Sequence, residues 1–114
     1  MAEQGVAPEL EMDAMDAQCI HAVAYEGGRA IATGRLLPDG HIGRMAVLKQ
    51  HRGRGVGGAV LVKLMEAAKK RGDREVVLSA QVQAIAFYSA HGFEPQGGVY
   101  EEAGIPHQDM RRAL

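Results

Sequence analysis

The chain lacks the residues on which several large classes of protein depend. Its 114 residues include one cysteine, Cys19, and no tryptophan. One thiol cannot form an internal disulfide or supply a structural zinc site by itself, so neither kind of cross-link is expected. We interpret Cys19 as a small residue near the start of a strand, in a reducing compartment.

An excess of charge of one sign is also lacking. The 13 Lys and Arg residues oppose 14 Asp and Glu residues, and the formal net charge is −1. Such a balance favours neither nucleic acid nor a membrane surface as a partner. The chain has few aromatic residues to stack bases, so we interpret the basic run at residues 69–71 as a solvated helix end.

Long hydrophobic runs are absent. No segment is apolar for the roughly 18 residues that a membrane-spanning helix needs. The first basic residue is Arg29, whereas secretory signals and transit peptides need basic residues at the N-terminus. A cytoplasmic location is therefore the default expectation. The composition, 46% hydrophobic and 24% charged, is that of an ordinary globular protein, and the length suits a single domain over residues 1–114.

Alternating apolar and polar residues predict strands in the first half of the chain. Residues 1–18 show weak periodicity and are expected to form a loop or a short helix. A strand over 19–25, a hairpin turn and a return strand over 29–37 follow. After a second tight turn, a third strand is expected over 41–48.

Helical spacing marks the second half. Apolar residues from Val56 to Ala68 fall on one face of a helix that Gly72 should end. The other expected elements are a strand over 74–80, a helix over 83–91, and closing strands over 93–100 and 107–114. The order β-β-β-α-β-α-β-β contains one strand–helix–strand unit. It predicts an α/β (α+β) fold, with helices packed on a mixed, mostly antiparallel sheet.

A glycine-rich turn between the third strand and the first helix is the sharpest functional signal. It comprises Arg52, Gly53, Arg54, Gly55, Val56, Gly57 and Gly58. A helix start leaves backbone N–H groups unpaired and carries the positive end of the helix dipole. Glycines let an anion approach that backbone, and two arginines add charged donors. The turn therefore predicts a site for phosphate or pyrophosphate.

Other interpretations of this turn fit less well. A P-loop needs Gly-Lys-Ser/Thr where this chain has Gly57-Gly58-Ala59. The segment that starts at Gly53 matches the dinucleotide-binding pattern G-x-G-x-x-G. That pattern, however, requires an acidic residue at the end of the next strand, whereas Glu75 lies at the start of the next strand of this chain. The antiparallel strands before the turn also disfavour a doubly wound fold. A surface turn with solvated arginines remains open.

The same turn and its flanking segments resemble the GNAT acetyltransferase superfamily. Arg52-x-x-Gly55-x-Gly57 is similar to the family's R/Q-x-x-G-x-G/A signature, Met45–Leu48 looks like its fourth strand, and Gln81–Phe93 resembles a second segment that usually ends Tyr-x-x-x-Gly-Phe. Residues 34–38 and 102–107, with Met110, are similar to the ElaA-like bacterial branch. The resemblance covers about residues 3–113. The chain departs from the family in lacking the usual N-terminal strand and helix.

This resemblance implies acetyl-CoA as cosubstrate and direct transfer of its acetyl group to an amine. Backbone N–H groups from Arg52 to Gly58 would hold the pyrophosphate. The backbone of Met45, Ala46 and Val47 would pair with the pantetheine arm, and a bulge there would direct an N–H to the thioester oxygen. Gln81 stands where many family members have Asn, and its amide would also bind the pantetheine.

The resemblance makes Tyr88 the general acid for the leaving thiolate, and an aromatic packed in the core is the alternative. An alkyl amine is only about one part in a thousand neutral near pH 7.4, so a base is also needed. His107, His41, Glu11 and Asp13 are candidates, and the sequence does not choose among them. No metal site is expected, because the five histidines are scattered without carboxylates at ligand spacing.

The expected partners are an acceptor and a second copy of the chain. The acceptor is an amine of a small molecule or a peptide, and the sequence does not separate the two. An alternative function is a non-catalytic CoA-binding module, or a fragment whose acceptor site is incomplete. A sheet face left bare by missing N-terminal elements would expose an apolar patch, so a homodimer is expected.

Overall fold

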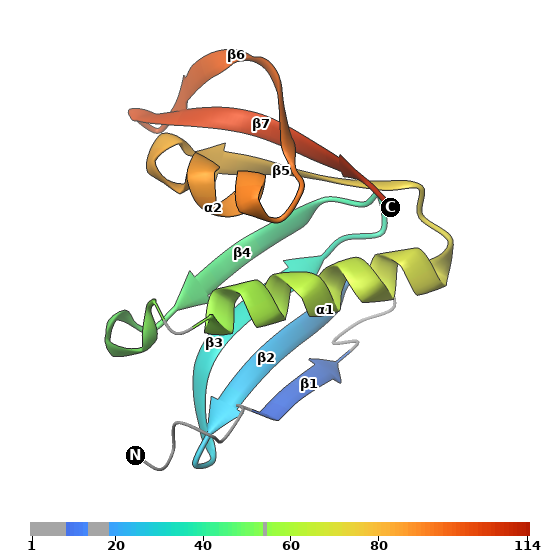
Figure 1. The fold of residues 1–114 in the computed structure, drawn as a ribbon, viewed down its shortest axis with the longest axis vertical. Helices are drawn as coiled ribbons and strands as arrows, with labels where there is room; N and C mark the ends of the chain where they lie inside the picture. The colour runs from blue at the N-terminus through green and yellow to red at the C-terminus, as the bar shows by residue number, and fades with distance from the viewer. Residues whose placement is uncertain (1–8, 14–18, 54) are drawn as a thin grey trace.

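The computed structural model describes residues 9–13, 19–53 and 55–114 (Figure 1). Its first strands are β1 (Glu9–Asp13), β2 (Ile20–Glu26), β3 (Arg29–Leu36) and β4 (Ile42–Val47). The elements that follow are η2 (Lys49–His51), α1 (Val56–Arg71), β5 (Glu75–Gln81), η3 (Val82–Ala84), α2 (Ile85–Ala90), β6 (Glu94–Glu102) and β7 (Ile105–Ala113). Within the described residues, no helix is both long and apolar enough to cross a membrane.

The strands form two sheets that meet at one point. The four-stranded sheet has the order β1-β2-β3-β4, the three-stranded sheet has the order β5-β7-β6, and all their pairs are antiparallel. A single parallel bridge joins His41 to Val77, where the Val77 N–H donates to the Gly40 carbonyl at 3.1 Å. The expected fold class is confirmed. The parallel strand pair expected across the strand–helix–strand unit is reduced to this bridge, because β4 and β5 diverge beyond it (Figure 1).

Two expectations about the elements were wrong. Residues 9–13 form a strand, not a loop or short helix, and Leu10 lies opposite Ala24 of β2. The strand depends on this distant partner, which local periodicity does not reveal. Strands β6 and β7 also extend further into the closing hairpin than expected. The turn between them is only Ala103 and Gly104, both with positive φ, as a tight hairpin turn requires. Residues 1–8 and 14–18 lie outside the described part.

Helix α1 supplies one side of the core. Its apolar stripe is buried against the four-stranded sheet: Val56, Val60, Leu61, Leu64, Met65 and Ala68. On β2 the facing residues are Ala22 and Ala24, which are fully buried and small enough to let the helix come close. The helix ends as expected at Gly72, whose φ of 100° suits glycine and whose N–H bonds the carbonyls of the last turn.

Glycine at position 34 is required by close packing between β3, β4 and α1. A Cβ atom there would lie 2.5 Å from the sulfur of Met45 and 3.0 Å from a methyl group of Leu64. Both contacts are shorter than van der Waals packing allows, so the side chains of Met45 and Leu64 would have to shift. Gly34 therefore fixes how closely α1 approaches the sheet.

We predict that Gly34→Ala lowers the free energy of unfolding by about 1–3 kcal/mol, as overpacking a dense core generally does. Urea denaturation followed by circular dichroism measures the change. The matched control is Gly98→Ala, because a Cβ at Gly98 meets nothing within 4 Å. Equal stability of the two variants would show that the core at Gly34 relaxes freely.

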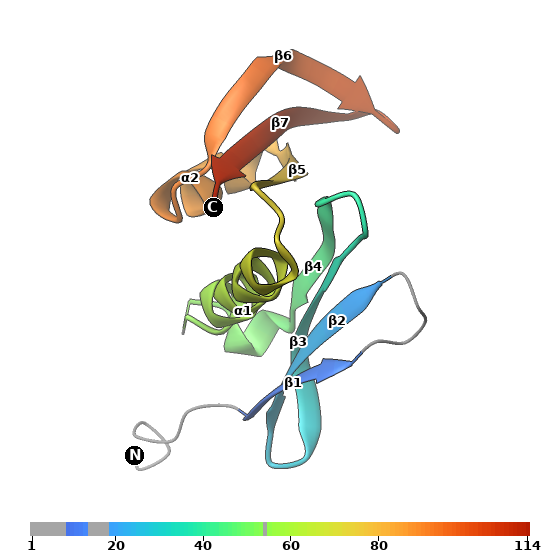
Figure 2. The ribbon, with the colours of Figure 1, turned by 90° about the vertical axis from the view of Figure 1, so that its right-hand side faces the viewer.

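Both helices lie on the same side of the molecule. Figure 2 shows α1 against one face of the four-stranded sheet, with no helix of the described part covering the other face. That outer face carries the β2 and β3 residues that alternate with the buried ones: His21, Val23, Tyr25, Thr33 and Arg35. It is a mixed surface, not the broad apolar patch that was expected.

Candidate functional site

A groove of about 1170 Å³ lies beside β4. It is lined by β4, the turn after it, α1 as far as Glu66, and α2, together with Leu10 of β1 and Ala84 of η3. Eight residues expected to bind the cofactor line it: Met45, Ala46, Val47, Arg52, Gly53, Gly55, Gly57 and Gly58. Val56 is instead buried in the core, and Arg54 lies outside the described residues. Gln81 lines a second cavity, described below.

The N-terminus of α1 forms one end of the groove with no side chain of its own in the way. The N-cap residue is Gly55, whose φ of 79° is left-handed, and no side chain caps the helix there. A Cβ at Gly57 would lie 3.2 Å from Val47, and one at Gly58 would lie 2.9 Å from Nε2 of His91. The first-turn N–H groups of a 16-residue helix thus face the groove between two glycines, which suits an anionic group.

A bulge lies in β4 where the groove begins. Thr33 and Arg35 of β3 lie opposite Ala46 and Gly43, so β4 contains one extra residue at this point. The bulge places Arg44 at a φ of 54°, an uncommon conformation for a residue with a side chain. It interrupts the regular pairing of the strand just before the three residues expected to meet the pantetheine.

Arg52 has a contact that sequence reasoning did not foresee. Its Nε donates to the Val47 carbonyl at 3.2 Å, so the side chain folds back over the end of β4. The sequence placed Arg52 only beside a phosphate. Its guanidinium retains further N–H groups for that role, since a single one is used here.

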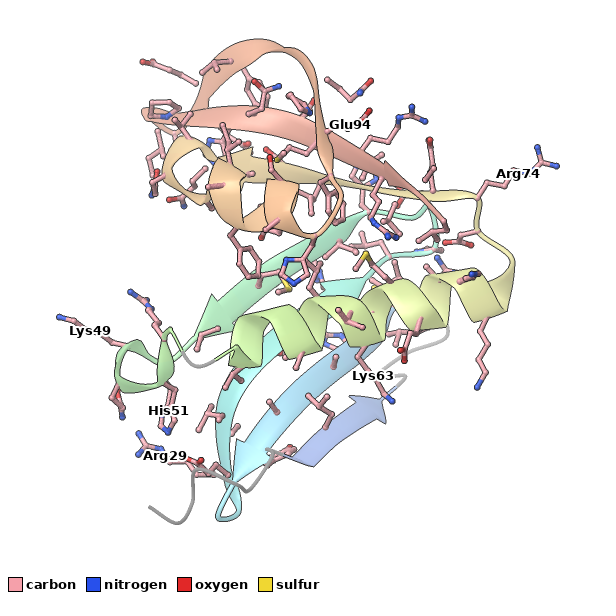
Figure 3. All side chains as sticks on the ribbon, viewed as in Figure 1. Arg29, Lys49, His51, Lys63, Arg74 and Glu94 are labelled. Carbon is pink, nitrogen blue, oxygen red and sulfur yellow. The ribbon has the colours of Figure 1, made fainter. Side chains whose placement is uncertain are left out.

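His51 is a second residue whose position the sequence did not indicate. It is buried, and its Nε2 lies 3.0 Å from Oε1 of Glu26 at the end of β2. Figure 3 shows its ring pointing from η2 towards the β2–β3 hairpin, near Arg29. This contact ties the glycine-rich turn to the hairpin. Only a fold that brings residues 26 and 51 together makes the pair visible.

Tyr88 stands at the boundary between two cavities. It lies on α2, is half-buried, and lines both the groove and a second cavity of about 370 Å³. Its ring makes edge-to-face contacts with Phe87 and Phe93, with ring centres 5.0 and 5.9 Å apart. Burial raises the pKa of the phenol, which keeps it protonated at neutral pH. A hydroxyl held in this state can give a proton to a leaving group.

The second cavity lies between β4 and β5. It is lined by residues 42–45 and 78–81, together with Ala84, Tyr88 and His107. The Oε1 atom of Gln81 accepts a hydrogen bond of 2.5 Å from Gln83. Of the candidate bases, His107 lines this cavity. His41 lines neither cavity. Its backbone N–H donates to the Asp39 carboxyl at 3.1 Å and its Nδ1 lies 3.0 Å from the same oxygen, and these contacts lower the pKa of that carboxyl. Glu11 and Asp13 belong to β1, the far edge of the other sheet.

Several known proteins are similar to this chain in sequence and in fold. A family model described as an acetyltransferase (GNAT) domain matches residues 3–114. An uncharacterized N-acetyltransferase of Bacillus subtilis, YjcF, is 38% identical over 114 residues, covering 96% of this chain and 81% of that protein. The crystal structure of Escherichia coli ElaA is 32% identical, with a TM-score of 0.75, over 86% of this chain and 74% of that one.

The fold is also shared with a GNAT acetyltransferase from Elizabethkingia anophelis that was solved with acetyl-CoA bound. That structure is 17% identical, with a TM-score of 0.71, over 85% of this chain and 77% of that one. The family match covers nearly the whole chain. The protein is therefore a member of the GNAT acetyltransferase family, and it is an acyltransferase. The family uses acetyl-CoA.

We predict that Gly57→Val weakens coenzyme A binding at least tenfold, because the new methyl groups would fill the groove between Val47 and Phe87. Isothermal titration calorimetry with coenzyme A measures the change. Lys70→Val is the control, since it places the same β-branched residue on an exposed part of α1. Unchanged affinity in Gly57→Val would show that the ligand does not pass over this turn.

Proposed function

We propose that the protein transfers the acetyl group of acetyl-CoA directly to a primary amine. The observation that carries this proposal is the position of Tyr88, a half-buried phenol that lines both cavities. One cavity ends at a bare helix N-terminus, which suits a phosphate-bearing cosubstrate. The other opens between β4 and β5 and is large enough for a small amine or the tip of a side chain.

Different segments of the groove suit different parts of coenzyme A. The N–H groups between Arg52 and Gly58 face the pyrophosphate, where the helix dipole favours negative charge. The pantetheine arm lies along the edge of β4 at Met45, Ala46 and Val47, as an added strand would. Arg52 releases the Val47 carbonyl to make room for the arm, and its guanidinium turns to the phosphates. Gln81 binds the end of the pantetheine nearest the second cavity.

The reaction takes place where the two cavities meet. The amine attacks the thioester carbonyl carbon, and negative charge develops on the carbonyl oxygen. A backbone N–H at the β4 bulge stabilises that charge, and one such donor contributes about 3–4 kcal/mol in other enzymes. As the carbon–sulfur bond breaks, Tyr88 gives its proton to the sulfur. The acceptor is an amine of a small molecule or a peptide.

Calorimetric titration of the purified chain with acetyl-CoA tests the cosubstrate. We expect saturable binding of acetyl-CoA and no binding of NADH, which carries a pyrophosphate but no pantetheine. Equal binding of both ligands would show that the turn recognises only the phosphates. Absence of binding would contradict the proposed function at its first step.

We predict that Tyr88→Phe lowers kcat at least tenfold and leaves the acetyl-CoA affinity within about twofold, because it removes only the proton donor. Release of the CoA thiol gives the rate, and calorimetry gives the affinity. Tyr25→Phe, on the outer face of β2, is the control. A parallel loss of both quantities would assign Tyr88 to packing. Unchanged turnover would remove Tyr88 from the mechanism. A wild-type chain that binds acetyl-CoA but releases no thiol would favour the alternative, a CoA-binding module without catalysis.

The pH profile gives a second readout of Tyr88. The pKa of this phenol is raised above its ordinary value of 10.0, and only the protonated form can donate. The wild-type rate should therefore hold through neutral and mildly alkaline pH and fall as the pH rises through the raised pKa. Tyr88→Phe should lack that alkaline fall, which a stopped-flow pH series can measure.

The proposal includes a homodimer in the cytoplasm. The outer face of the four-stranded sheet has no described helix over it (Figure 2), and a second copy could cover it by a two-fold contact. The single cysteine is compatible with a reducing compartment. Sedimentation velocity at micromolar concentration tests the assembly. A single monomer boundary would contradict it.

A further inference from the structure

The second cavity is lined by a histidine that does not line the groove. His107 lies on β7, opposite Gln81 of β5 and Tyr100 of β6. It is half-buried and lines the same cavity as Tyr88. The two side chains therefore meet a molecule in this cavity from different elements, Tyr88 from α2 and His107 from the three-stranded sheet. No step of the proposed reaction so far uses His107.

One hydrogen bond fixes the tautomer of this imidazole. Nδ1 of His107 lies 2.8 Å from the carbonyl oxygen of Ile105. A carbonyl oxygen can only accept, so Nδ1 must carry the hydrogen. In the neutral ring, Nε2 then has a lone pair and no hydrogen, and none of the described residues donates to it. The ring is thus held as a proton acceptor at Nε2.

The orientation of the ring is also supported from the sheet. Tyr100 stacks on His107, with ring centres 6.0 Å apart and an angle of 24° between the planes. The Tyr100 hydroxyl donates to Asp109 at 2.7 Å and lies 2.5 Å from the hydroxyl of Ser79. Strands β5, β6 and β7 therefore all contribute to the position of one ring, although these side chains are exposed to solvent.

We propose that His107 is the general base that removes the proton from the acceptor amine. This inference rests on the proposed function, because it assigns a residue to the amine half of that reaction. An alkyl amine reaches the cavity as an ammonium ion, which has no lone pair with which to attack. His107 Nε2 takes one proton from the ammonium and later passes it to solvent.

The protons balance over the whole reaction. Two protons leave the acceptor nitrogen, the first to His107 and the second as the carbon–nitrogen bond forms. The second restores the proton that Tyr88 gives to the sulfur when the carbon–sulfur bond breaks. The products are the amide, coenzyme A thiol and one proton in solvent, and no oxidant or metal is needed.

The charged and titratable groups around His107 come from every strand and helix that borders it. Arg44 of β4 lines the same cavity, and no described residue pairs with its guanidinium. Tyr88 of α2 and Tyr100 of β6 are the phenols, and Asp109 of β7 is held by Tyr100.

A comparison of two small nucleophiles distinguishes proton removal from the other steps of the reaction. Methylamine is almost entirely an ammonium ion at neutral pH, whereas hydroxylamine is mostly neutral and can attack without a base. Both fit a cavity of about 370 Å³. The purified full chain is given saturating acetyl-CoA and either nucleophile between pH 6 and 8, and thiol release gives kcat/KM.

The informative variant is His107→Asn, whose side-chain N–H can keep the bond to Ile105 but offers no base. We expect kcat/KM for methylamine to fall about 100-fold, a usual share for general base catalysis, while hydroxylamine changes less than about twofold. His41→Asn, at a histidine outside both cavities, should match the wild type.

Chemical rescue by imidazole distinguishes a catalytic role of His107 from a structural one. In His107→Ala, free imidazole in the buffer should restore a saturable part of the methylamine rate, and it should restore none in Tyr88→Phe. Equal losses with both nucleophiles, no loss with either, or absence of rescue would each overturn the assignment of His107. A wild-type chain that binds acetyl-CoA but acetylates neither nucleophile would overturn the transferase function itself, and this inference with it.

Discussion

The organisation of the site depends on two strands that touch once and then diverge. Strands β4 and β5 share one parallel bridge between His41 and Val77, and each then continues in its own antiparallel sheet. Backbone groups that a continuous sheet would pair are left along the edge of β4. The second cavity lies in this gap and the groove lies beside β4, and Tyr88 of α2 lines both. The fold thus leaves two cavities next to each other by leaving a sheet incomplete.

The close packing of α1 on the four-stranded sheet, and the glycines at its start, shape the groove beside β4. Small residues on the sheet let α1 lie deep, and the glycines of its first turn leave its N–H groups uncovered. Larger residues at these positions would stabilise the helix but would close the groove. Glycine in a helix interior costs about 1 kcal/mol relative to alanine. The sequence Val56-Gly57-Gly58 therefore has low helix propensity at the start of α1, and such local departures from stability are typical of functional sites.

Local pattern was enough to predict most of the fold and to identify the glycine-rich turn that lines the groove. Alternation predicted β2 to β4, and helical spacing predicted α1. Pattern did not reveal β1, because an edge strand of five residues depends on its pairing with β2. It also could not show that Gln81 faces the second cavity or that Glu26 meets His51, since both follow from tertiary packing. The choice among candidate bases likewise needed the arrangement of β5, β6 and β7.

The contact between Arg52 and the Val47 carbonyl also affects how the open edge of β4 meets other chains. An open strand edge is a template on which another chain can add a strand, and exposed edges are a common origin of aggregation. Here an arginine occupies a carbonyl at one end of the edge, and the bulge with charged Arg44 distorts the other end. Fewer backbone groups of β4 are therefore available for strand addition by another chain. One arginine of the glycine-rich turn thus also serves to limit an exposed strand edge.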